Sequence, residues 1–500
     1  MQKLYEESPF AFALNSDYAG SYCCFCLKRS KCLKTCSRCQ FARYCNEVCQ
    51  KDGWIDHRKE CRCLQNYSSS KGGAIPDQQV RVIARILFKI RNGQTGNTSI
   101  NGTTTRSFTD LLSHIDEISE AVEFVRSPKT FEDQTLIAAG IRSMVNAAKN
   151  SKEKHSQEEL ADQLKKTFQS DSIGKILRGL DFLHFEEEMR AYMDTKTSSS
   201  TSFQELLEIY GKVAINSFAI ENYKGEPIAK GVYVGLSVLD HSCDPDLTFI
   251  FDGTKAILLP LKDSSSSIPW YQQRISYLEP GLFREIRQEK LEDRYYFVCD
   301  CTFCTDEIRE QRMKAVQCTA GECCGCVLLD LKQETASCEV CHSRSPDFAV
   351  ALDLMINRTR IMKSLDNLLF LIQQKSEMKY EVFDESQRVL AQIRRYLHPI
   401  NRVRAEFLQK FASISKALQK FREAYDLLEE SLQSDRYFIS QNSPHWCPMM
   451  LEQGRTLLAA GCKRQAKAEI AKTLHAAEII YGPKHELCDE IKKVLKRTKI

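Results

Sequence analysis

The stretch CCFCLKRSKCLKTCSRCQFARYCNEVCQKDGWIDHRKEC, from Cys23 to Cys61, contains four pairs of metal-ligand side chains whose members are separated by two or three residues. The pairs are Cys23 and Cys26, Cys36 and Cys39, Cys45 and Cys49, and His57 and Cys61. Zn²⁺ prefers four thiolate or imidazole ligands at tetrahedral corners, and one such pair supplies two corners from a single turn. Four pairs therefore predict two closed zinc sites in about forty residues, too few to bury a core unaided. Disulfides or unrelated cysteines are the alternative, which this regular spacing disfavours.

The overall composition is that of a globular protein from a reducing compartment. Five hundred residues allow roughly two to four domains, and 43% apolar with 27% charged residues is ordinary for such proteins. A net charge of only +4 argues against a dedicated polyanion binder. Twenty-three cysteines without a recognisable secretory signal indicate metal binding, in the cytoplasm, the nucleus or both. No apolar run approaches the roughly 20 residues of a membrane span, so we expect no membrane association.

Apolar periodicity and turn signals divide the first half of the chain. Residues 1–20 include a short apolar and aromatic segment that reads as strand, and the Ser/Gly stretch Tyr67–Gly73 reads as a linker. A helical zone follows to about residue 210, with polar stretches at Asn97–Thr105 and Thr195–Ser202 that read as loops. Three short strands are predicted next, at Gly231–Leu239, Leu247–Phe251 and Ala256–Leu261.

The second half carries further cysteines and then helices. One cysteine cluster lies at residues 299–304 and another at 318–341. Beyond about residue 349 the pattern is helical throughout, with two similar helix pairs that recur after about 40 residues. This period indicates a tetratricopeptide-like repeat bundle. A plain helical bundle is the alternative, and either would offer an interaction surface.

Three segments in the middle of the chain carry residues suited to chemistry. They are Asn216-Ser217-Phe218, the segment Leu239-Asp240-His241-Ser242-Cys243-Asp244-Pro245, and Tyr277 followed by Tyr295, Phe297 and the C-x-C-x2-C run at Cys299, Cys301 and Cys304. Three thiols are one ligand short of a tetrahedral zinc site. Cys243 is the natural fourth donor if the chain folds back on itself.

These motifs resemble known modules. The 23–61 stretch resembles the MYND zinc finger, and the middle segments resemble a SET domain with its cysteine-rich post-SET region. In this order, with helices behind, they are similar to the SMYD family of protein lysine methyltransferases, in which the MYND finger interrupts the SET domain. The resemblance implies an α+β multidomain fold with these parts: 1–20 SET remnant, 21–65 MYND finger, 66–210 helical insert, 211–280 SET core, 281–345 post-SET region, 346–500 C-terminal helical repeats.

The resemblance also implies roles for individual residues. One MYND zinc would be held by Cys23, Cys26, Cys45 and Cys49, and the other by Cys36, Cys39, His57 and Cys61. A third zinc would be held by Cys243, Cys299, Cys301 and Cys304. S-adenosylmethionine would contact Asn216, Asp240, His241, Tyr277, Tyr295 and Phe297, with Tyr277 as the active-site tyrosine. The implied partners are a histone or other protein substrate and Pro-containing peptides at the MYND finger. We expect a monomer with no specific nucleic-acid ligand.

The sequence departs from the family pattern in three places. The family's G-x-G segment, with its neighbouring cation for the cofactor carboxylate, would precede Leu4 and is missing here, which suggests a shortened N-terminus. Asp240 stands where the family has Asn, and Ser264–Ser267 replace an acidic turn. A catalytically impaired scaffold that binds partners through the MYND finger and the C-terminal helices is therefore the alternative to an enzyme.

One further metal site is left open by the sequence. A fourth zinc would draw on Cys318, Cys323 or Cys324, Cys326, Cys338 and Cys341, and reduced structural cysteines are the alternative.

Overall fold

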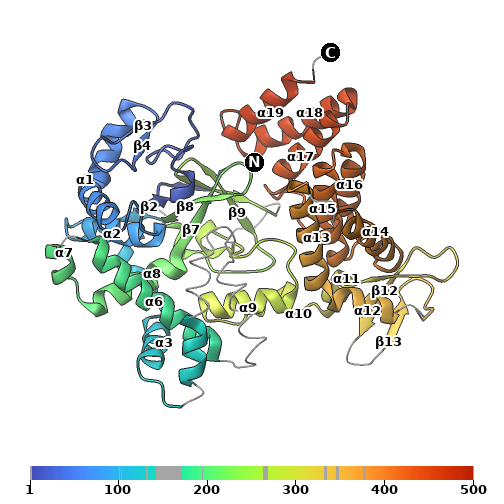
Figure 1. Cartoon of the computed structure of the whole chain (residues 1–500), viewed down its shortest axis with the longest axis horizontal. Helices are drawn as coiled ribbons and strands as arrows, with labels where there is room; N and C mark the ends of the chain where they lie inside the picture. The colour runs from blue at the N-terminus through green and yellow to red at the C-terminus, as the bar shows by residue number, and fades with distance from the viewer. Residues whose placement is uncertain are drawn as a thin grey trace.

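The protein mixes helices and small sheets, as the predicted α+β class requires. The computed structural model describes residues 3–100, 102, 104–130, 133–141, 172–193, 195–262, 268–330, 335–344, 348–375 and 379–498. In Figure 1 the segments coloured blue to yellow form one half of the molecule, and the orange and red helices of the C-terminal part lie beside them. The predicted altered turn at Ser264–Ser267 lies outside the described residues.

Two antiparallel sheets combine strands from distant parts of the chain. Their strand orders are β1 (Tyr5–Glu7), β10 (Lys255–Pro260), β9 (Leu247–Asp252), and β2 (Ala11–Leu14), β8 (Pro227–Val232), β7 (Ser217–Glu221). Tyr5 is aligned with Leu258, and Ala11 with Val232. All four residues of β2 are buried, as expected for a strand covered on both faces. The N-terminal segment therefore belongs to the same sheets as residues 217–260, and everything between the two is an insertion.

The insertion holds the cysteine-rich finger and a group of helices. Its elements are η1 (Ser16–Tyr18), β3 (Lys34–Thr35), β4 (Arg43–Tyr44), α1 (Glu47–Ser70), α2 (Gln78–Ile90), β5 (Thr98–Ser99), β6 (Thr105–Arg106), η2 (Phe108–Asp110), α3 (Ile115–Arg126), α6 (Ser172–Tyr192), α7 (Thr195–Ser200) and α8 (Phe203–Asn216). Helix α2 packs against β2 and β8 and is buried from Val80 to Phe88. Burial around the whole circumference, which includes the side chains of Arg81 and Arg85, makes α2 the centre of this half.

Two short 3-10 helices and a mixed segment complete this part of the chain. The 3-10 helix η3 (Leu236–Val238) lies between β8 and β9, and η4 (Trp270–Gln272) follows β10. The segment expected to be the post-SET region then contains α9 (Arg284–Tyr295), α10 (Thr302–Thr305), α11 (Glu307–Met313), and a small sheet of β11 (Val316–Gln317), β12 (Cys326–Asp330) and β13 (Thr335–Cys338). In Figure 1 helix α9 runs beneath the sheets toward α10, and the small sheet lies at the foot of the C-terminal helices.

The C-terminal part is helical throughout its described residues, as predicted. The helices are α12 (Phe348–Ile356), α13 (Arg358–Gln373), α14 (Lys379–Tyr396), α15 (Arg402–Ala417), α16 (Phe421–Phe438), α17 (Trp446–Ala459), α18 (Lys463–Ile480) and α19 (Glu486–Lys496). Helix α15 packs on α16, and α17 on α18. Each pair turns through a residue with positive φ, Gln419 and then Gly461, which accounts for the repeat in the sequence. At Gly454 a Cβ atom would lie 2.4 Å from Ile470, so this glycine lets α17 and α18 approach closely.

The C-terminal helices pack on the sheet formed by β1, β10 and β9. His485 donates a hydrogen bond from Nε2 to the Phe251 carbonyl at 2.8 Å, and Ile480 and Tyr481 pack on buried side chains of β9 and β10. No described helix has the length and apolar character to span a membrane.

Several predicted elements were wrong in detail. The strand predicted at Gly231–Leu239 ends at Val232 and gives way to the 3-10 helix η3, because the Glu7 carboxylate accepts hydrogen bonds from the Gly235 and Leu236 amides. The stretch Tyr67–Gly73 is not a linker along its whole length, since α1 continues to Ser70 and Tyr67 is buried and bonded to Glu188.

Two predicted loops also contain regular structure. Residues 195–200 form the short helix α7, although Ser and Thr are poor helix formers. The polar stretch Asn97–Thr105 contains most of the β5–β6 hairpin, whose Thr98 hydroxyl lies 3.3 Å from that of Tyr5. Tertiary contacts therefore overrode local propensity in these segments.

Candidate functional site

Four sets of metal-ligand side chains converge in the described part of the chain, with the ligand atoms of each set within 4.8 Å of one another. Three sets contain the twelve ligands expected from the sequence, in the expected groupings. We call them the first set (Cys23, Cys26, Cys45, Cys49), the second set (Cys36, Cys39, His57, Cys61), the third set (Cys243, Cys299, Cys301, Cys304) and the fourth set (Cys318, Cys323, Cys338, Cys341).

The spacing of the sulfur atoms fits zinc. Thiolates at tetrahedral corners with Zn–S bonds of about 2.3 Å lie about 3.8 Å apart. The Sγ–Sγ distances are 3.8 Å between Cys26 and Cys45, 3.5 Å between Cys45 and Cys49, and 3.8 Å between Cys36 and Cys61. The donor chemistry and geometry therefore suit structural Zn²⁺.

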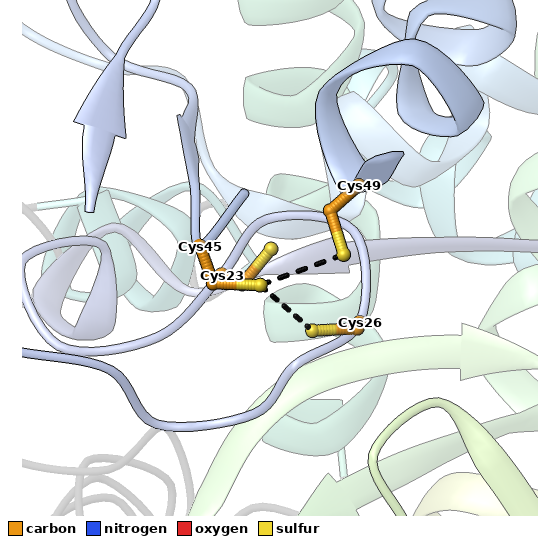
Figure 2. Close-up of side chains that lie close together, drawn as sticks. All are labelled: Cys23, Cys26, Cys45 and Cys49. Carbon is orange, nitrogen blue, oxygen red and sulfur yellow. Dashed lines mark hydrogen bonds between the residues drawn. The ribbon is translucent and has the colours of Figure 1, made fainter. Parts of the chain in front are cut away.

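The first set is assembled from a loop, the segment after β4 and the first turn of α1. Figure 2 shows its four sulfur atoms pointing toward a common centre. Asn46 caps α1 and accepts a hydrogen bond from the Cys49 amide at 2.8 Å, which fixes the helix start next to the ligands. The helix then carries His57 and Cys61 into the second set.

The second set is supported by a buried carboxylate. His57 faces Cys39 Sγ with Nε2 at 3.6 Å, and its Nδ1 lies 3.8 Å from Glu60 Oε2. Glu60 accepts from Arg85 Nε at 3.0 Å, and Arg85 Nη1 donates to the Phe12 carbonyl of β2 at 2.5 Å. Burial alone would raise the pKa of Glu60, but the Arg85 guanidinium overcomes it and lowers that pKa to about 2. Through Arg85, this carboxylate behind the ligand histidine ties the finger to the sheet.

The third set joins the loop after η3 to the segment after α9. Cys243 Sγ lies 3.5 Å from Cys304 Sγ. The side chain of Gln288 on α9 accepts from the Cys299 amide at 2.8 Å and donates to its carbonyl at 2.6 Å. Arg287, on the same helix, is buried, pairs with Glu310 at 2.9 Å and donates to Cys304 Sγ at 3.7 Å. Helix α9 therefore holds the C-x-C-x2-C run against Cys243.

His241 links the third set to the predicted active-site tyrosine. The Tyr277 amide donates to His241 Nδ1 at 3.0 Å, so the ring proton sits on Nε2, which lies 3.2 Å from Cys243 Sγ. Burial, with the nearby charges of Arg287 and Arg274, lowers the pKa of His241 to about 4. The neutral imidazole therefore donates toward the thiol and couples the position of Tyr277 to that of a metal ligand.

The aromatic residues expected around the reaction centre lie together. Tyr277 is 5.2 Å from His241 and 4.7 Å from Tyr295 between ring centroids, and Phe297 is 6.0 Å from His241. The rings of Tyr277, Tyr295 and Phe297 belong to the same apolar cluster as the third set. The Tyr277 hydroxyl donates to the Leu239 carbonyl at 2.7 Å. Burial raises the pKa of Tyr277, and the nearby Asp240 and Tyr295 add to the effect, so the phenol stays neutral at physiological pH.

The remaining predicted cofactor residues differ in their surroundings. Asn216 ends α8, and its Nδ2 donates to the carbonyls of Leu112 at 2.9 Å and Lys212 at 2.8 Å, so this amide ties the end of α8 to the segment before α3. Asp240 is exposed beside the aromatic cluster.

One charged residue near this cluster was missed from the sequence. Arg106, in β6, lies within electrostatic reach of Asp240, Tyr277 and Glu7. Its Nε is buried and has no hydrogen-bond partner among the described residues. Arg106 follows a polar stretch read as loop, and no local motif distinguishes it from other surface arginines. Arg106 is therefore a cation close to the aromatic cluster.

Comparisons with known proteins agree with this geometry. The MYND finger family matches residues 23–61. Human histone-lysine N-methyltransferase SMYD3 is 27% identical over 310 residues, 62% of this chain and 58% of that protein. Danio rerio N-lysine methyltransferase SMYD2-B is 22% identical over 487 residues, 97% of this chain and 91% of that protein. Arabidopsis thaliana histone-lysine N-methyltransferase ASHR1 is 24% identical over 344 residues, 67% of this chain and 58% of that protein.

The matched share of the sequence differs between these relatives. The chain spans less than two thirds of the length of the human relative, whereas the match to the Danio rerio relative covers 91% of that protein. The MYND finger, the interrupted sheets and these relatives together show that the chain is similar to the SMYD family of SET and MYND domain proteins.

Proposed function

We propose that this protein is an S-adenosylmethionine-dependent protein lysine N-methyltransferase that acts on histones or other proteins. The observation that carries the proposal is the environment of Tyr277. Its hydroxyl is fixed by Leu239, and its ring is enclosed by His241 and Tyr295 next to the third set. The lysine methyltransferase names of the relatives point to the same activity.

The Tyr277 hydroxyl has a defined role in this proposal. Because its proton is donated to the Leu239 carbonyl, its oxygen is left to accept a hydrogen bond from the lysine ε-amine. That contact turns the amine lone pair away from Tyr277 and toward the methyl group. Alignment of this kind is the main contribution that a protein makes to a direct displacement.

The aromatic surroundings also favour the reactive form of the substrate. A lysine ammonium has a pKa of about 10.4 in water and must lose a proton before it can attack. Burial among Tyr277, Tyr295 and Phe297 disfavours the charged form and lowers that pKa. S-adenosylmethionine, when bound, supplies an electrophilic methyl group on a cationic sulfur. The rings exclude water from the amine.

Arg106 is assigned the cofactor carboxylate under this proposal, with Asp240 beside it for the ammonium group. Arg106→Ala should weaken S-adenosylmethionine binding by about 10- to 100-fold, since a charge-assisted hydrogen bond contributes about 1.5–3 kcal/mol. Arg58, exposed on α1, serves as the control position. Equal affinities of Arg106→Ala and Arg58→Ala for the cofactor would remove Arg106 from the site.

The activity itself is tested by transfer of a radiolabelled methyl group. Zinc-replete protein is incubated with labelled S-adenosylmethionine and an array of histone and non-histone peptides, each lysine peptide being paired with its Arg-substituted version. We expect label on particular lysine peptides and none on their partners. A folded protein that binds the cofactor but labels no peptide and no protein mixture would contradict the proposal.

The MYND finger is proposed to bind Pro-containing peptides. Trp54 and Ile55 of α1 are exposed by 43% and 77%, and with Phe88 they line a groove between α1 and α2. Trp54→Ala should abolish peptide binding, whereas Ile308→Ala, which removes an exposed apolar side chain from α11, should not.

We also propose that the protein is a monomer. We place it in the nucleus and the cytoplasm, where histone and other protein substrates occur.

A further inference from the structure

The cysteines between residues 318 and 341 form a compact ribbon outside the site described above. The turn that joins β11 to β12 holds Cys318 and Cys323, while Cys338 ends β13 and Cys341 lies in the turn after it. Cys318 Sγ lies 3.6 Å from Cys341 Sγ, and Cys323 Sγ lies 3.7 Å from Cys338 Sγ. These distances match the roughly 3.8 Å between thiolates on one tetrahedral zinc ion. We propose that the fourth set holds a structural zinc ion that fastens the post-SET region to the C-terminal helices.

Backbone amides already point at the sulfur atoms of this set. The Gly325 amide donates to Cys323 Sγ at 3.4 Å, and the Val340 amide donates to Cys338 Sγ at 3.4 Å. In each case the donor lies two residues after the cysteine. Such N–H groups stabilise a thiolate and orient it toward a metal. The two turns therefore present their thiols as a matched pair of ligand loops.

The strand register selects four ligands from the six candidate cysteines. Cys338 is paired across the strands with Val327, so Cys326 points to the opposite face of β12, where its thiol donates to Glu339 at 2.6 Å. Cys324 is exposed and its thiol points to the Glu322 carbonyl. The thiols of Cys324 and Cys326 therefore point away from the centre of the fourth set, and the other four cysteines surround it.

Gly325 shows how closely the ribbon is built around its sulfur atoms. A Cβ atom at this position would lie 2.6 Å from Cys338 Sγ and 2.8 Å from the Val340 side chain. Only glycine allows the β12 turn to approach the β13 turn to the distance that shared ligation requires. The close approach of these two turns brings their cysteine thiols within reach of one metal ion.

The ribbon lies between α11 and the C-terminal helices and contacts both. It follows α11, which is anchored beneath the third set by the buried pair of Arg287 and Glu310. On its other side, the Ala315 carbonyl accepts hydrogen bonds from the Asn401 side chain at 2.9 Å and the His398 amide at 3.1 Å. Val316 is bridged to Leu397. Cys318, Val327 and Cys338 share one apolar core with α13, α14 and α15.

Apart from its packing on α13, α14 and α15, a small ribbon of this kind has few means of stability besides a metal. Short strands without a large apolar face depend on a ligand for a fixed structure. Zinc at the fourth set would hold the ribbon's buried face against α14 and α15, and its loss would loosen the contact between the post-SET region and the C-terminal helices.

The test is the zinc content of the intact protein. Protein purified under reducing conditions is passed over a chelating resin, and zinc is measured by mass spectrometry relative to protein concentration. We expect four equivalents for the wild type and three for Cys323→Ser/Cys341→Ser, which removes the two ligands of the set that are not buried. The control Cys32→Ser/Cys324→Ser, which removes two exposed cysteines outside all four sets, should keep four.

Further outcomes are equally decisive. Three equivalents of zinc in the wild type, or equal zinc in both double variants, would overturn the proposal. Disulfides between the cysteines of the fourth set, in protein purified under these reducing conditions, would overturn it too. We also expect the midpoint of thermal unfolding to fall by several degrees in Cys323→Ser/Cys341→Ser and to stay unchanged in the control. Because zinc content and thermal unfolding do not depend on methyl transfer, the result stands apart from the proposed enzyme activity.

Discussion

The Tyr277 hydroxyl is the single group whose removal is most informative for the proposed reaction. In Tyr277→Phe the ring remains, with its contacts to His241 and Tyr295, and only the oxygen is lost. The substrate amine then has no acceptor at this point, and the Leu239 carbonyl loses the donor that lies 2.7 Å away. The substitution therefore separates alignment of the amine from the shape of the channel.

The expected magnitudes follow from these contacts. Loss of one positioned hydrogen bond at a reaction centre reduces kcat by about 10²- to 10³-fold, or about 2.7–4 kcal/mol. The KM for peptide should change by less than about threefold, because the aromatic walls that bind the lysine stem are retained. The unpaired carbonyl should lower the free energy of unfolding by about 1–3 kcal/mol. Zinc content should not change.

The assay compares initial rates of labelled methyl transfer at saturating cofactor over a range of peptide concentrations. Tyr271→Phe is the matched control, since it removes a tyrosine hydroxyl from a ring that packs on Trp270, and it should leave kcat unchanged. An unchanged kcat in Tyr277→Phe would refute the role of the hydroxyl. A fall in kcat accompanied by loss of zinc would show that the variant acts through the third set instead.

Other consequences can be measured on the folded protein. Chelation should unfold the finger that contains the first and second sets, because it lacks a core of its own, and retention of its circular dichroism after complete zinc removal would contradict this. Glu310→Gln, which leaves Arg287 buried and unpaired, should reduce stability by about 3–5 kcal/mol in urea denaturation, whereas Glu285→Gln at an exposed pair should change it by less than about 1 kcal/mol. Burial lowers the pKa of Lys230 to about 8, below its unfolded value, so wild-type stability should gain about 1–3 kcal/mol as pH rises from 8 to 10.5, relative to Lys230→Gln. A stability difference between these two proteins that is the same at both pH values would contradict the lowered pKa of that half-buried ammonium group.

The metal sites could be predicted from sequence to the extent that ligand spacing is local. Pairs such as Cys23 and Cys26 determine which side chains share a turn, and the family resemblance supplied the interleaving and the return of Cys243 to Cys299. The choice among Cys323, Cys324 and Cys326 could not be made, since it depends on the strand register that places Cys338 opposite Val327. Register is a property of paired strands, and a single strand's sequence does not contain it.

Segments governed by tertiary contacts were predicted least well. The strand expected through Leu239 ends early because the distant Glu7 carboxylate caps the amides of η3. The polar stretch before Arg106 forms a hairpin next to Tyr5, and that contact spans more than ninety positions of the chain. Local periodicity carries no information on such contacts, so both the hairpin and the cation that it positions emerge only from the fold.

The central claim is tested most directly by calorimetric titration of S-adenosylmethionine into zinc-replete protein of this sequence. The account predicts saturable one-to-one binding with a micromolar Kd, weakened about 10- to 100-fold in Arg106→Ala. Absence of binding by the folded, zinc-replete chain would contradict the claim that Tyr277, Arg106 and the third set form a methyl-transfer site.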